Sequence, residues 1–378
     1  MKNKITLSYI FKRGAAFCLV PLLLFSCGGK NKVAEPSKTV GVSRAAELVL
    51  QSTGQNGETP EGSASVPAED GQPSADSTGE GTVTGSAAGS ATGGVSWSFS
   101  GGKYTYNFPE PDRSALSDLT DINNTSRAFF DDVNPNDPGG TWYFAPTSID
   151  PVTGEMILNW GKDRSDATLA LLDQYGGIYR GDTSRKVCYL TFDCGYENGY
   201  TGKIIDTLNA KGVSGTFFVT GDYVRDAADL VGRMLNEGHI VGNHTLNHYN
   251  MTQQTAEEFI NQIESVEKMV KTAYPDAPAM LYYRPPEGAT NEWALKLADK
   301  MGIRTVLWSY TYKDYDTNNQ LDTYTALENL KGGLHPGCVY LMHAVSSTNA
   351  AVLGDLIDWI KAQGYEILPL CDIDVNNG

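Results

Sequence analysis

The sequence predicts an α/β protein whose main domain, residues 158–378, is a distorted or incomplete (β/α) TIM-like barrel, preceded by a disordered linker and a small irregular extension. Between Val187 and Leu370, short β-branched or aromatic runs alternate with amphipathic stretches, which is typical of a parallel sheet with crossover helices. Polar side chains of catalytic types follow the predicted strands, where barrel enzymes place their chemistry. The alternating part spans roughly 190 residues, whereas an eightfold barrel usually needs about 250. We therefore expect an incomplete barrel.

Residues 1–27 have the pattern of an export signal. A basic start precedes an apolar run, Ala15–Phe25, that is too short to be a stable membrane span. The run ends in Leu24-Phe25-Ser26-Cys27, which resembles a bacterial lipobox and implies cleavage before Cys27 and a lipid anchor on its sulfur. An ordinary secretory signal cleaved nearby is the alternative. Both predict a mature protein that works outside the cytoplasm.

Residues 28–95 are expected to form a disordered tether. Residues 51–94 contain no Lys, Arg or aromatic residue and consist mainly of Gly, Ser, Thr, Ala and acidic residues, so they cannot bury enough apolar surface to fold. Residues 96–157 bring aromatic residues back among many Pro and Gly residues, without clear helical periodicity. We expect an irregular or small β-rich extension there.

The main domain is predicted to contain seven short strands, rich in β-branched and aromatic residues, with amphipathic helices between them. The predicted strands are Val187–Phe192, Gly215–Thr220, Ile240–Gly242, Leu281–Tyr283, Thr305–Trp308, Val339–Met342 and Glu366–Leu368. The predicted helices are Thr201–Lys211, Ala227–Glu237, Thr255–Ala273, Glu292–Met301, Tyr324–Leu330 and Ala350–Gln363.

Candidate catalytic residues stand at the carboxyl ends of these strands. Asp193 follows the first strand, His244 the third, Arg284 the fourth and His343 the sixth, and Asp314 lies shortly after the fifth. Since parallel strands end at the same edge, these side chains are expected to meet there. Residues with purely structural roles would instead be scattered over helix surfaces.

His244 and His248 are candidate metal ligands. Their spacing of four residues would place both imidazoles on one face of a helical turn, where they could share a metal ion. The spacing alone is weak evidence, since chance or capping would also produce it.

Several segments, in this order, resemble successive motifs of the polysaccharide deacetylases of the NodB-homology group, carbohydrate esterase family four. They are Thr191-Phe192-Asp193-Cys194-Gly195-Tyr196, Gly242-Asn243-His244 through His248, Arg284-Pro285-Pro286-Glu287-Gly288 and Leu341-Met342-His343. Trp308-Ser309 and the His343-Ala344-Val345-Ser346 ending are similar to the PdaA-type, delta-lactam-forming peptidoglycan deacetylases. The resemblance extends from about Asn159 to Asp374.

The resemblance implies a distorted parallel barrel that hydrolyses the N-acetyl group of an amino sugar. Asp193 matches the general base of the family, and Arg284 matches the arginine that fixes it. His343 matches the acid that protonates the departing amine. Asp314 matches the carboxylate that orients this histidine and raises its pKa. A backbone N–H near Glu287 matches the donor that stabilises the oxyanion.

The resemblance also implies a divalent metal, for which we expect Zn²⁺, held by His244 and His248. Such an ion lowers the pKa of bound water from 15.7 to about 7. Many family members carry a second Asp directly after the base as the third ligand, where this chain has Cys194. A Cys194 thiolate would suit Zn²⁺. A small thiol that only fills space, with waters completing a weak site, is an equal alternative.

Three residues are candidates for substrate binding: Tyr196, Glu287 and Trp308. Glu287 stands where the PdaA type tends to have Arg, so its contacts with the glycan are expected to differ. Trp308, with Tyr310 and Tyr312, would line a wall on which a sugar stacks, although packing in the core explains these aromatic residues equally well.

The composition excludes some classes of function. The net charge of −16 over 378 residues, without clustered Lys and Arg, excludes nucleic acid as a partner. No internal stretch reaches the roughly 18 apolar residues of a membrane span, which excludes a polytopic membrane protein. Cys188, Cys338 and Cys371 lie in or beside predicted strands and are expected to be buried free thiols.

We therefore expect a monomeric, lipid-anchored, metal-dependent de-N-acetylase of cell-wall glycan, which acts on N-acetylmuramic acid of peptidoglycan. The sequence leaves open whether the enzyme also closes the muramic delta-lactam. One alternative keeps the chemistry and changes the polymer to chitin-like or xylan chains. Another is a wall-binding lipoprotein that has lost catalysis.

Overall fold

The computed structural model describes residues 83–86, 94–130, 148–149, 156–157 and 165–376. The predicted export signal, most of the predicted tether and parts of the extension lie outside the described residues. Within these ranges, no helix has the length and hydropathy needed to cross a bilayer.

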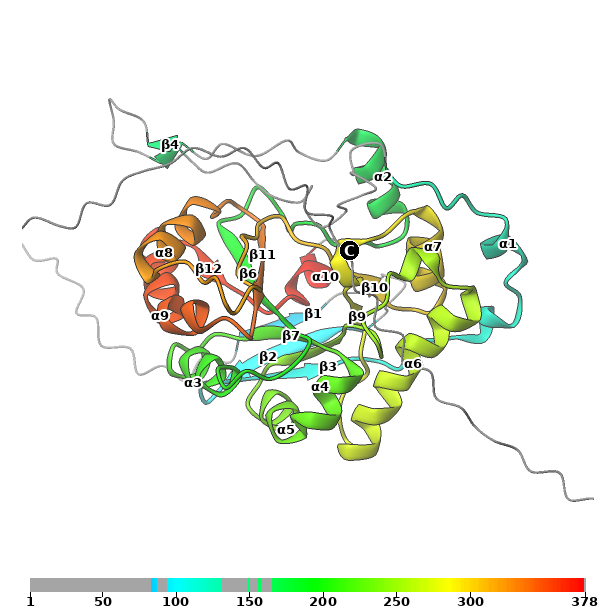
Figure 1. Cartoon of the computed structure of the whole chain (residues 1–378), viewed down its shortest axis with the longest axis horizontal. Coiled ribbons are helices and arrows are strands. Elements are labelled where there is room, and N and C mark those ends of the chain that lie inside the picture. Colours follow the sequence, from blue (N-terminus) through cyan, green and yellow to red (C-terminus); the bar gives the residue numbers. More distant parts are fainter. Residues whose placement is uncertain (1–82, 87–93, 131–147, 150–155, 158–164, 377–378) are drawn as a thin grey trace, which may run out of the picture. The chain divides into compact units, whose positions relative to one another are not determined.

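The main domain is a curled parallel sheet with helices around it (Figure 1). The strand order is β10-β9-β8-β7-β6-β11, and β12 also pairs with β6. The strands are β6 (Val187–Cys194), β7 (Gly215–Val219), β8 (Ile240–Asn243), β9 (Tyr282–Tyr283), β10 (Arg304–Thr305), β11 (Cys338–His343) and β12 (Glu366–Ile367). All their pairings are parallel. The prediction of a distorted (β/α) barrel is confirmed.

The connections between strands are mainly helical. The helices are α2 (Asp166–Gln174), α3 (Thr201–Ala210), α4 (Gly221–Asp226), α5 (Ala228–Asn236), α6 (Ala256–Ala273), α7 (Glu292–Lys300), α8 (Thr323–Gly332), α9 (Ser347–Ala362) and α10 (Asp372–Asn376). The longest, α6, begins with a capping box between Thr255 and Glu258. The sequence did not predict α2, α4 or α10. Helices α4 and α10 have only 6 and 5 residues, too few to show a helical period.

The sheet is distorted where β10 and β11 would have to meet. The predicted strand Thr305–Trp308 is wrong beyond Thr305, because β10 ends there and the chain continues as isolated bridges. Val306 bridges to Ile178, and Tyr310 bridges to Tyr340 in β11. An irregular segment thus connects the two edges in place of a regular strand.

The two faces of the sheet pack into separate layers. Along β6, Cys188, Leu190, Phe192 and Cys194 belong to the cluster that also contains apolar residues of α3, α5 and α9. The alternate residue Tyr189 belongs to a second cluster inside the barrel. This alternation follows from the two-residue period of a strand and decides which β6 side chains can reach the barrel interior.

An antiparallel sheet precedes the barrel, consisting of β1 (Val83–Ser86), β2 (Ser96–Ser100) and β3 (Lys103–Asn107). It corresponds to the β-rich alternative for the extension. Gly101 and Gly102 join β2 to β3, both with positive φ (58° and 78°), as a two-residue hairpin turn requires. The prediction of coil up to residue 95 is wrong at Val83–Ser86, because the backbone of this segment pairs with β2 and forms a strand.

The β2–β3 hairpin packs against the amino-terminal end of the barrel strands. Trp97 and Val95 join the cluster inside the barrel. The Tyr106 hydroxyl contacts Ser214 Oγ at 2.6 Å, just before β7, and donates to the Gly238 carbonyl at 3.0 Å, just before β8. This end of the barrel is therefore covered.

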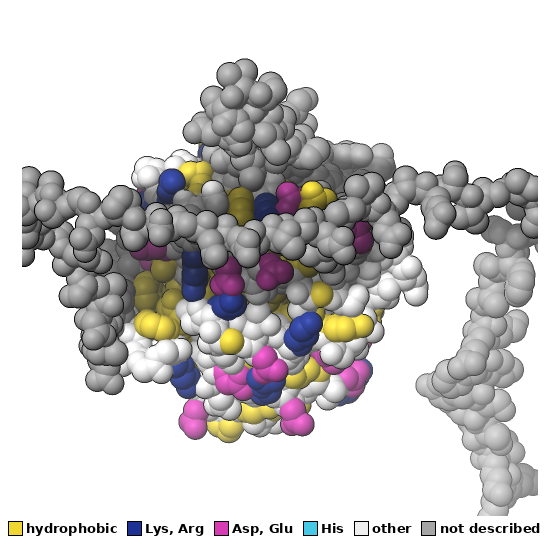
Figure 2. Space-filling view, turned by 90° about the vertical axis from the view of Figure 1, so that its left-hand side faces the viewer, with side chains coloured by type: hydrophobic (Ala, Val, Ile, Leu, Met, Phe, Trp, Pro, Cys, Tyr) yellow, Lys and Arg dark blue, Asp and Glu magenta, His cyan; other side chains and the backbone are white. Residues whose placement is uncertain are grey.

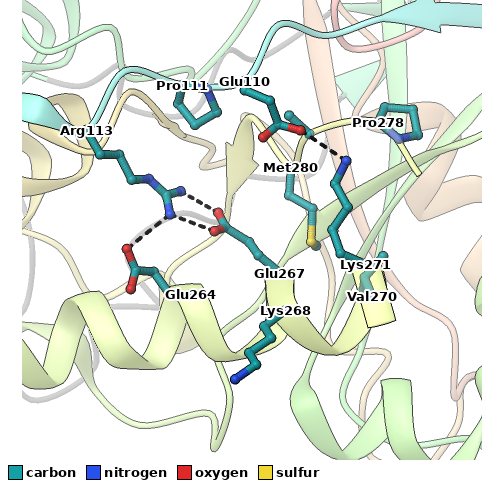
Figure 3. Close-up of a pocket in the computed structure, with 11 residues that line it drawn as sticks. Glu110, Pro111, Arg113, Glu264, Glu267, Lys268, Val270, Lys271, Pro278 and Met280 are labelled. Carbon is teal, nitrogen blue, oxygen red and sulfur yellow. Dashed lines mark hydrogen bonds and ion pairs between the residues drawn. The ribbon is translucent and has the colours of Figure 1, made fainter. Parts of the chain in front are cut away.

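Beyond the hairpin, residues 108–130 contain α1 (Thr120–Asn123) and run along α6 and α7. Arg113 donates to Glu267 at 2.6 and 2.8 Å and to Glu264 at 3.3 Å. These side chains lie beside a groove of about 350 Å³ (Figure 3). Further along, the Arg127 guanidinium lies 3.6 Å above the ring of Trp293. The extension is thus fixed to the barrel by ion pairs and packing. A further small pair, β4 (Ser148–Ile149) and β5 (Met156–Ile157), is antiparallel.

Helix α10 also lies at the covered end. Arg185 pairs with Asp372 at 2.9 Å, and Asp374 contacts both Arg304 and the Tyr282 hydroxyl. On the outer face drawn in Figure 2, basic and acidic side chains are interspersed.

Candidate active site

Asp193 is the penultimate residue of β6, and its side chain points into the barrel. Its Oδ1 accepts a hydrogen bond from Arg284 Nη1 at 2.8 Å, and its Oδ2 lies 3.5 Å from His244 Nε2. Burial alone would raise the pKa of Asp193, but the charges of Arg284, His244 and His343 lower it below its usual value. The carboxylate is therefore ionised and available to accept a proton.

Arg284 is fully buried and is held from several sides. Its Nη2 donates to Thr191 Oγ1 at 2.8 Å and to the Leu307 carbonyl at 3.1 Å, and its Nε donates to the Val306 carbonyl at 3.2 Å. Thr191 is a site residue that sequence analysis missed. Its position two residues before Asp193, on the same face of a strand, was the available signal.

His343 ends β11 and is the register partner of Asp193 in the neighbouring β6. Its Nδ1 lies 2.7 Å from Asp314 Oδ1, and its backbone N–H donates to Asp314 Oδ2 at 2.8 Å. Burial alone would lower the pKa of His343, but Asp314 and, to a smaller extent, Asp193 raise it above its usual value. The structure thus places a proton donor beside a proton acceptor.

A further residue, Asn349 in α9, fixes Asp314. Its Nδ2 donates to Asp314 Oδ2 at 2.5 Å, and its Oδ1 accepts from the Tyr312 hydroxyl at 2.5 Å. Asn349 and Asp314 are both almost completely buried. No sequence rule indicated Asn349, because it lies six residues after His343 and reaches the site only through the turn that starts α9.

His244 and His248 come together as predicted, but not on a helix. The segment after β8 is an irregular turn in which Thr245 and His248 have positive φ (70° and 54°), and the two imidazole centroids are 4.8 Å apart. The Leu246 N–H donates to the Gln262 carbonyl at 3.0 Å, which ties this turn to α6. The prediction of a helical turn is wrong, because a backbone with two left-handed residues cannot be helical there.

His244 has the properties of a metal ligand. Its Nδ1 lies 2.8 Å from the Arg284 carbonyl, which can only accept, so Nδ1 carries the proton and Nε2 keeps its lone pair. Burial lowers the pKa of His244 to about 4, and Asp193 opposes this only in part. The neutral imidazole presents Nε2 beside a carboxylate oxygen, a donor set that fits a divalent ion.

The structure does not bring Cys194 to this site. Cys194 is fully buried in the outer layer of the core, on the opposite face of β6 from Asp193. Burial raises the pKa of its thiol well above the usual value, and Asp193 and Glu197 add to this rise. Among the described side chains, no three His, Cys, Asp or Glu residues form a complete metal site. The geometry therefore supports the space-filling alternative for Cys194.

Glu287 and Tyr196 lie exposed at the same end of the sheet. Glu287 has φ of 61° and ψ of 5°, an uncommon conformation for a residue other than glycine. Tyr196 follows Asp193 in the loop after β6 and is exposed. Both positions allow contact with a substrate.

Trp308 is not positioned to stack on a sugar. Its side chain is only 3% exposed and belongs to the cluster inside the barrel, with its ring centroid 5.7 Å from the Arg284 guanidinium. Tyr310 and Tyr312 are buried as well. Core packing, the alternative interpretation, accounts for all three aromatic residues, so the prediction of Trp308 as a substrate-binding residue is wrong.

Comparisons with known proteins agree with this geometry. A family model described as polysaccharide deacetylase matches residues 180–306. Peptidoglycan-N-acetylmuramic acid deacetylase PdaA of Bacillus subtilis is 41% identical over 227 residues, which cover 57% of this chain and 85% of the relative. Peptidoglycan-N-acetylglucosamine deacetylase PgdA of Listeria monocytogenes is 33% identical over 198 residues, 52% of this chain and 40% of the relative.

A solved structure is similar over the same region. The structure of Bacillus subtilis PdaA, described as a family 4 carbohydrate esterase, aligns with a TM-score of 0.56 at 40% identity. The alignment covers 57% of this chain and 92% of that chain.

Proposed function

Because the chain belongs to the polysaccharide deacetylase family, we propose that it hydrolyses the N-acetyl group of N-acetylmuramic acid in peptidoglycan. The observation that carries the proposal is the pairing of Asp193 and His343 in register on β6 and β11, with opposite pKa shifts. The choice of muramic acid is supported by the relative PdaA, whose name gives this substrate.

Asp193 acts as the base in this proposal. Arg284 holds the carboxylate ionised and in a fixed orientation, so that it can take a proton from the attacking water. The new bond forms between the water oxygen and the acetyl carbon. The negative charge that develops on the carbonyl oxygen is stabilised by a backbone N–H near Glu287.

His343 acts as the acid. Its proton passes to the amide nitrogen as the bond between carbon and nitrogen breaks, which releases acetate and the free amine. Asp314 keeps the imidazole oriented through Nδ1, so that Nε2 is the atom that gives the proton. Base and acid return to their starting states when Asp193 loses its proton and His343 regains one.

We further propose that His244 and His248 hold a divalent ion, Zn²⁺. Cys194 is not one of its ligands in this proposal. When bound, the ion supplies Lewis acidity that polarises a carbonyl and lowers the pKa of water. The neutral state of His244 and the fixed Nδ1 proton support this assignment.

The test uses the full-length chain on peptide-free and peptide-bearing glycan strands, with added Zn²⁺ and with a chelator. Acetate is assayed and the products are identified by mass spectrometry. We expect acetate release at muramic residues of peptide-free strands, and loss of this activity with the chelator. Release only from N-acetylglucosamine would contradict the muramic assignment.

Two other outcomes separate the alternatives. If the chain binds metal but releases no acetate from either wall glycan, the substrate is another polysaccharide, such as chitin-like or xylan chains. If it binds no metal and shows no turnover, it is a wall-binding protein. A further loss of water from deacetylated muramic products would show that the delta-lactam closes.

We also propose that the protein acts on the outer side of the membrane and is anchored there by lipid on Cys27. The proposal rests on the pattern of residues 1–27 and on relatives that act on peptidoglycan. The test compares the native chain with Cys27→Ala in fractionated cells after metabolic labelling with a fatty acid. Fatty-acid label on Cys27→Ala, or no label on either the native chain or the variant, would contradict a lipid anchor on Cys27.

A further inference from the structure

The exposed large apolar side chains are concentrated at one end of the barrel. In the described part of the chain they are Tyr196, Tyr249, Tyr315, Leu321 and Tyr324. Each lies in a loop that leaves the carboxyl end of a strand, or in the first turn of the helix that follows. Single exposed apolar residues need no explanation, but their concentration around a reaction centre indicates a binding surface.

Three of these residues, Tyr315, Leu321 and Tyr324, share one segment that runs from the loop after β10 into the first turn of α8, which we call the aromatic loop (residues 315–324). Tyr324 is 74% exposed, the most of the five. The ring of Tyr315 lies edge-on to His343, with 5.6 Å between the centroids. The aromatic loop therefore begins beside the proposed acid.

The aromatic loop is fixed to the turn that follows His343. Gln320 Oε1 lies 2.5 Å from Ser346 Oγ, and Gln320 Nε2 donates to the Asp314 carbonyl at 2.7 Å. Thr348 Oγ1 donates to the Leu321 carbonyl at 2.9 Å. Aromatic side chains on an anchored backbone lose little conformational freedom when they bind, which is favourable for recognition.

We propose that Tyr315, Leu321 and Tyr324 form a glycan-binding surface for the sugar units beyond the one being deacetylated. The inference rests on the proposed function, and it adds that the enzyme prefers long strands to short ones. Sugar rings have an apolar face for the tyrosine rings and hydroxyl groups for their polar tips.

The experiment compares the full-length wild type with Tyr324→Ala on peptide-free glycan strands of increasing length, with added Zn²⁺. We expect kcat/KM of the wild type to rise with strand length. In Tyr324→Ala we expect it to fall about fivefold on long strands and less than twofold on the shortest, as the loss of one aromatic contact implies. Tyr324→Phe should restore the preference, because it keeps the ring.

The matched control is Glu328→Gln, an exposed position on α8 whose carboxylate pairs with Lys331 at 2.8 Å. It should keep the wild-type dependence on strand length. An equal loss in Tyr324→Ala on all strand lengths, or no loss on any, would overturn the proposal.

Strand binding, measured by calorimetry on the same proteins, separates this inference from the proposed function. Tighter binding of long strands that requires Tyr324, without acetate release, would support the surface and contradict the activity. Acetate release together with equal binding of short and long strands would support the activity and contradict the surface.

Discussion

At the carboxyl ends of the strands, Asp193 faces Arg284 with both side chains buried, whereas at the covered end Asp372 faces Arg185 and Asp374 faces Arg304. Both ends therefore contain a carboxylate paired with an arginine. They differ in what surrounds the pair. The covered end is closed by α10 and the β2–β3 hairpin, while the catalytic end carries exposed tyrosines and a histidine beside its carboxylate.

Backbone strain follows the same division. Among the described residues other than glycine, positive φ occurs at Thr245, His248 and Glu287, and all three lie in loops at the catalytic end. Such conformations cost of order 1–3 kcal/mol each and persist only where neighbouring contacts maintain them. Buried ion pairs alone therefore do not indicate function here, whereas an ion pair together with backbone strain and exposed side chains does.

The largest expected difference between the two ends is in activity. Asp193→Asn should reduce kcat/KM by about 10³-fold, because the proton acceptor is lost. Asp372→Asn, the matched change at the covered end, should leave kcat/KM within about twofold. Each variant removes one partner of a charge pair, so the free energy of unfolding should fall by up to about 3 kcal/mol, more for Asp193 because Arg284 is fully buried. Steady-state kinetics and denaturant unfolding measure the two effects. Equal losses of activity in both variants would remove the distinction between the ends.

Asp314→Asn should have the next largest effect, a decrease of about 10²-fold in kcat. The pKa of His343 is raised, so the basic limb of the wild-type pH profile should lie above the usual histidine value of about 6.5. The basic limb of the pH profile should move to lower pH in the variant.

The raised pKa of His343 also stabilises the fold at pH below about 6.5. This stabilisation is lost as pH rises through the raised value, and Asp314→Asn should remove the dependence. An unchanged basic limb would show that Asp314 does not support the protonated form of His343.

Asn349→Ala should reduce kcat by about tenfold and change KM little. The variant leaves one oxygen of the buried Asp314 without its amide donor, at a cost of about 1–3 kcal/mol in unfolding free energy. The basic limb of the pH profile should shift in the same direction as in Asp314→Asn, but less. Asp355→Asn, an exposed change on the same helix, is the control and should alter neither quantity. A loss of stability with an unchanged kcat and pH profile would limit Asn349 to a structural role.

Much of the catalytic end could be predicted from the sequence because it is made by strands. Parallel strands end at one edge, so the residues that follow Val187–Phe192 and Val339–Met342 were expected to meet there. The structure makes Asp193 and His343 register partners on neighbouring strands. The family is confirmed by the relative that is 41% identical and covered over 85% of its length.

The errors arose where side chains or backbone depart from regular periods. A spacing of four residues places two side chains on one face only where the backbone is helical. At His244 and His248, two left-handed residues bring the imidazoles together by another route. Trp308 lies in an irregular segment, where no period shows which side chains face inward. Asn349 reaches Asp314 through tertiary packing that local sequence does not encode.

The smallest expected effect concerns Cys194. Because its side chain lies on the outer face of β6, Cys194→Ala should keep the full metal content and lose only about 1 kcal/mol of stability from the small cavity. His248→Ala, which changes a proposed ligand on the exposed side of the site, should instead lose bound metal. Metal stoichiometry after dialysis, measured by atomic emission on both variants, decides between them. Loss of metal in Cys194→Ala would mean that β6 can turn this residue toward the barrel. The division between a reactive inner face and a packed outer face would then not hold at the end of the strand.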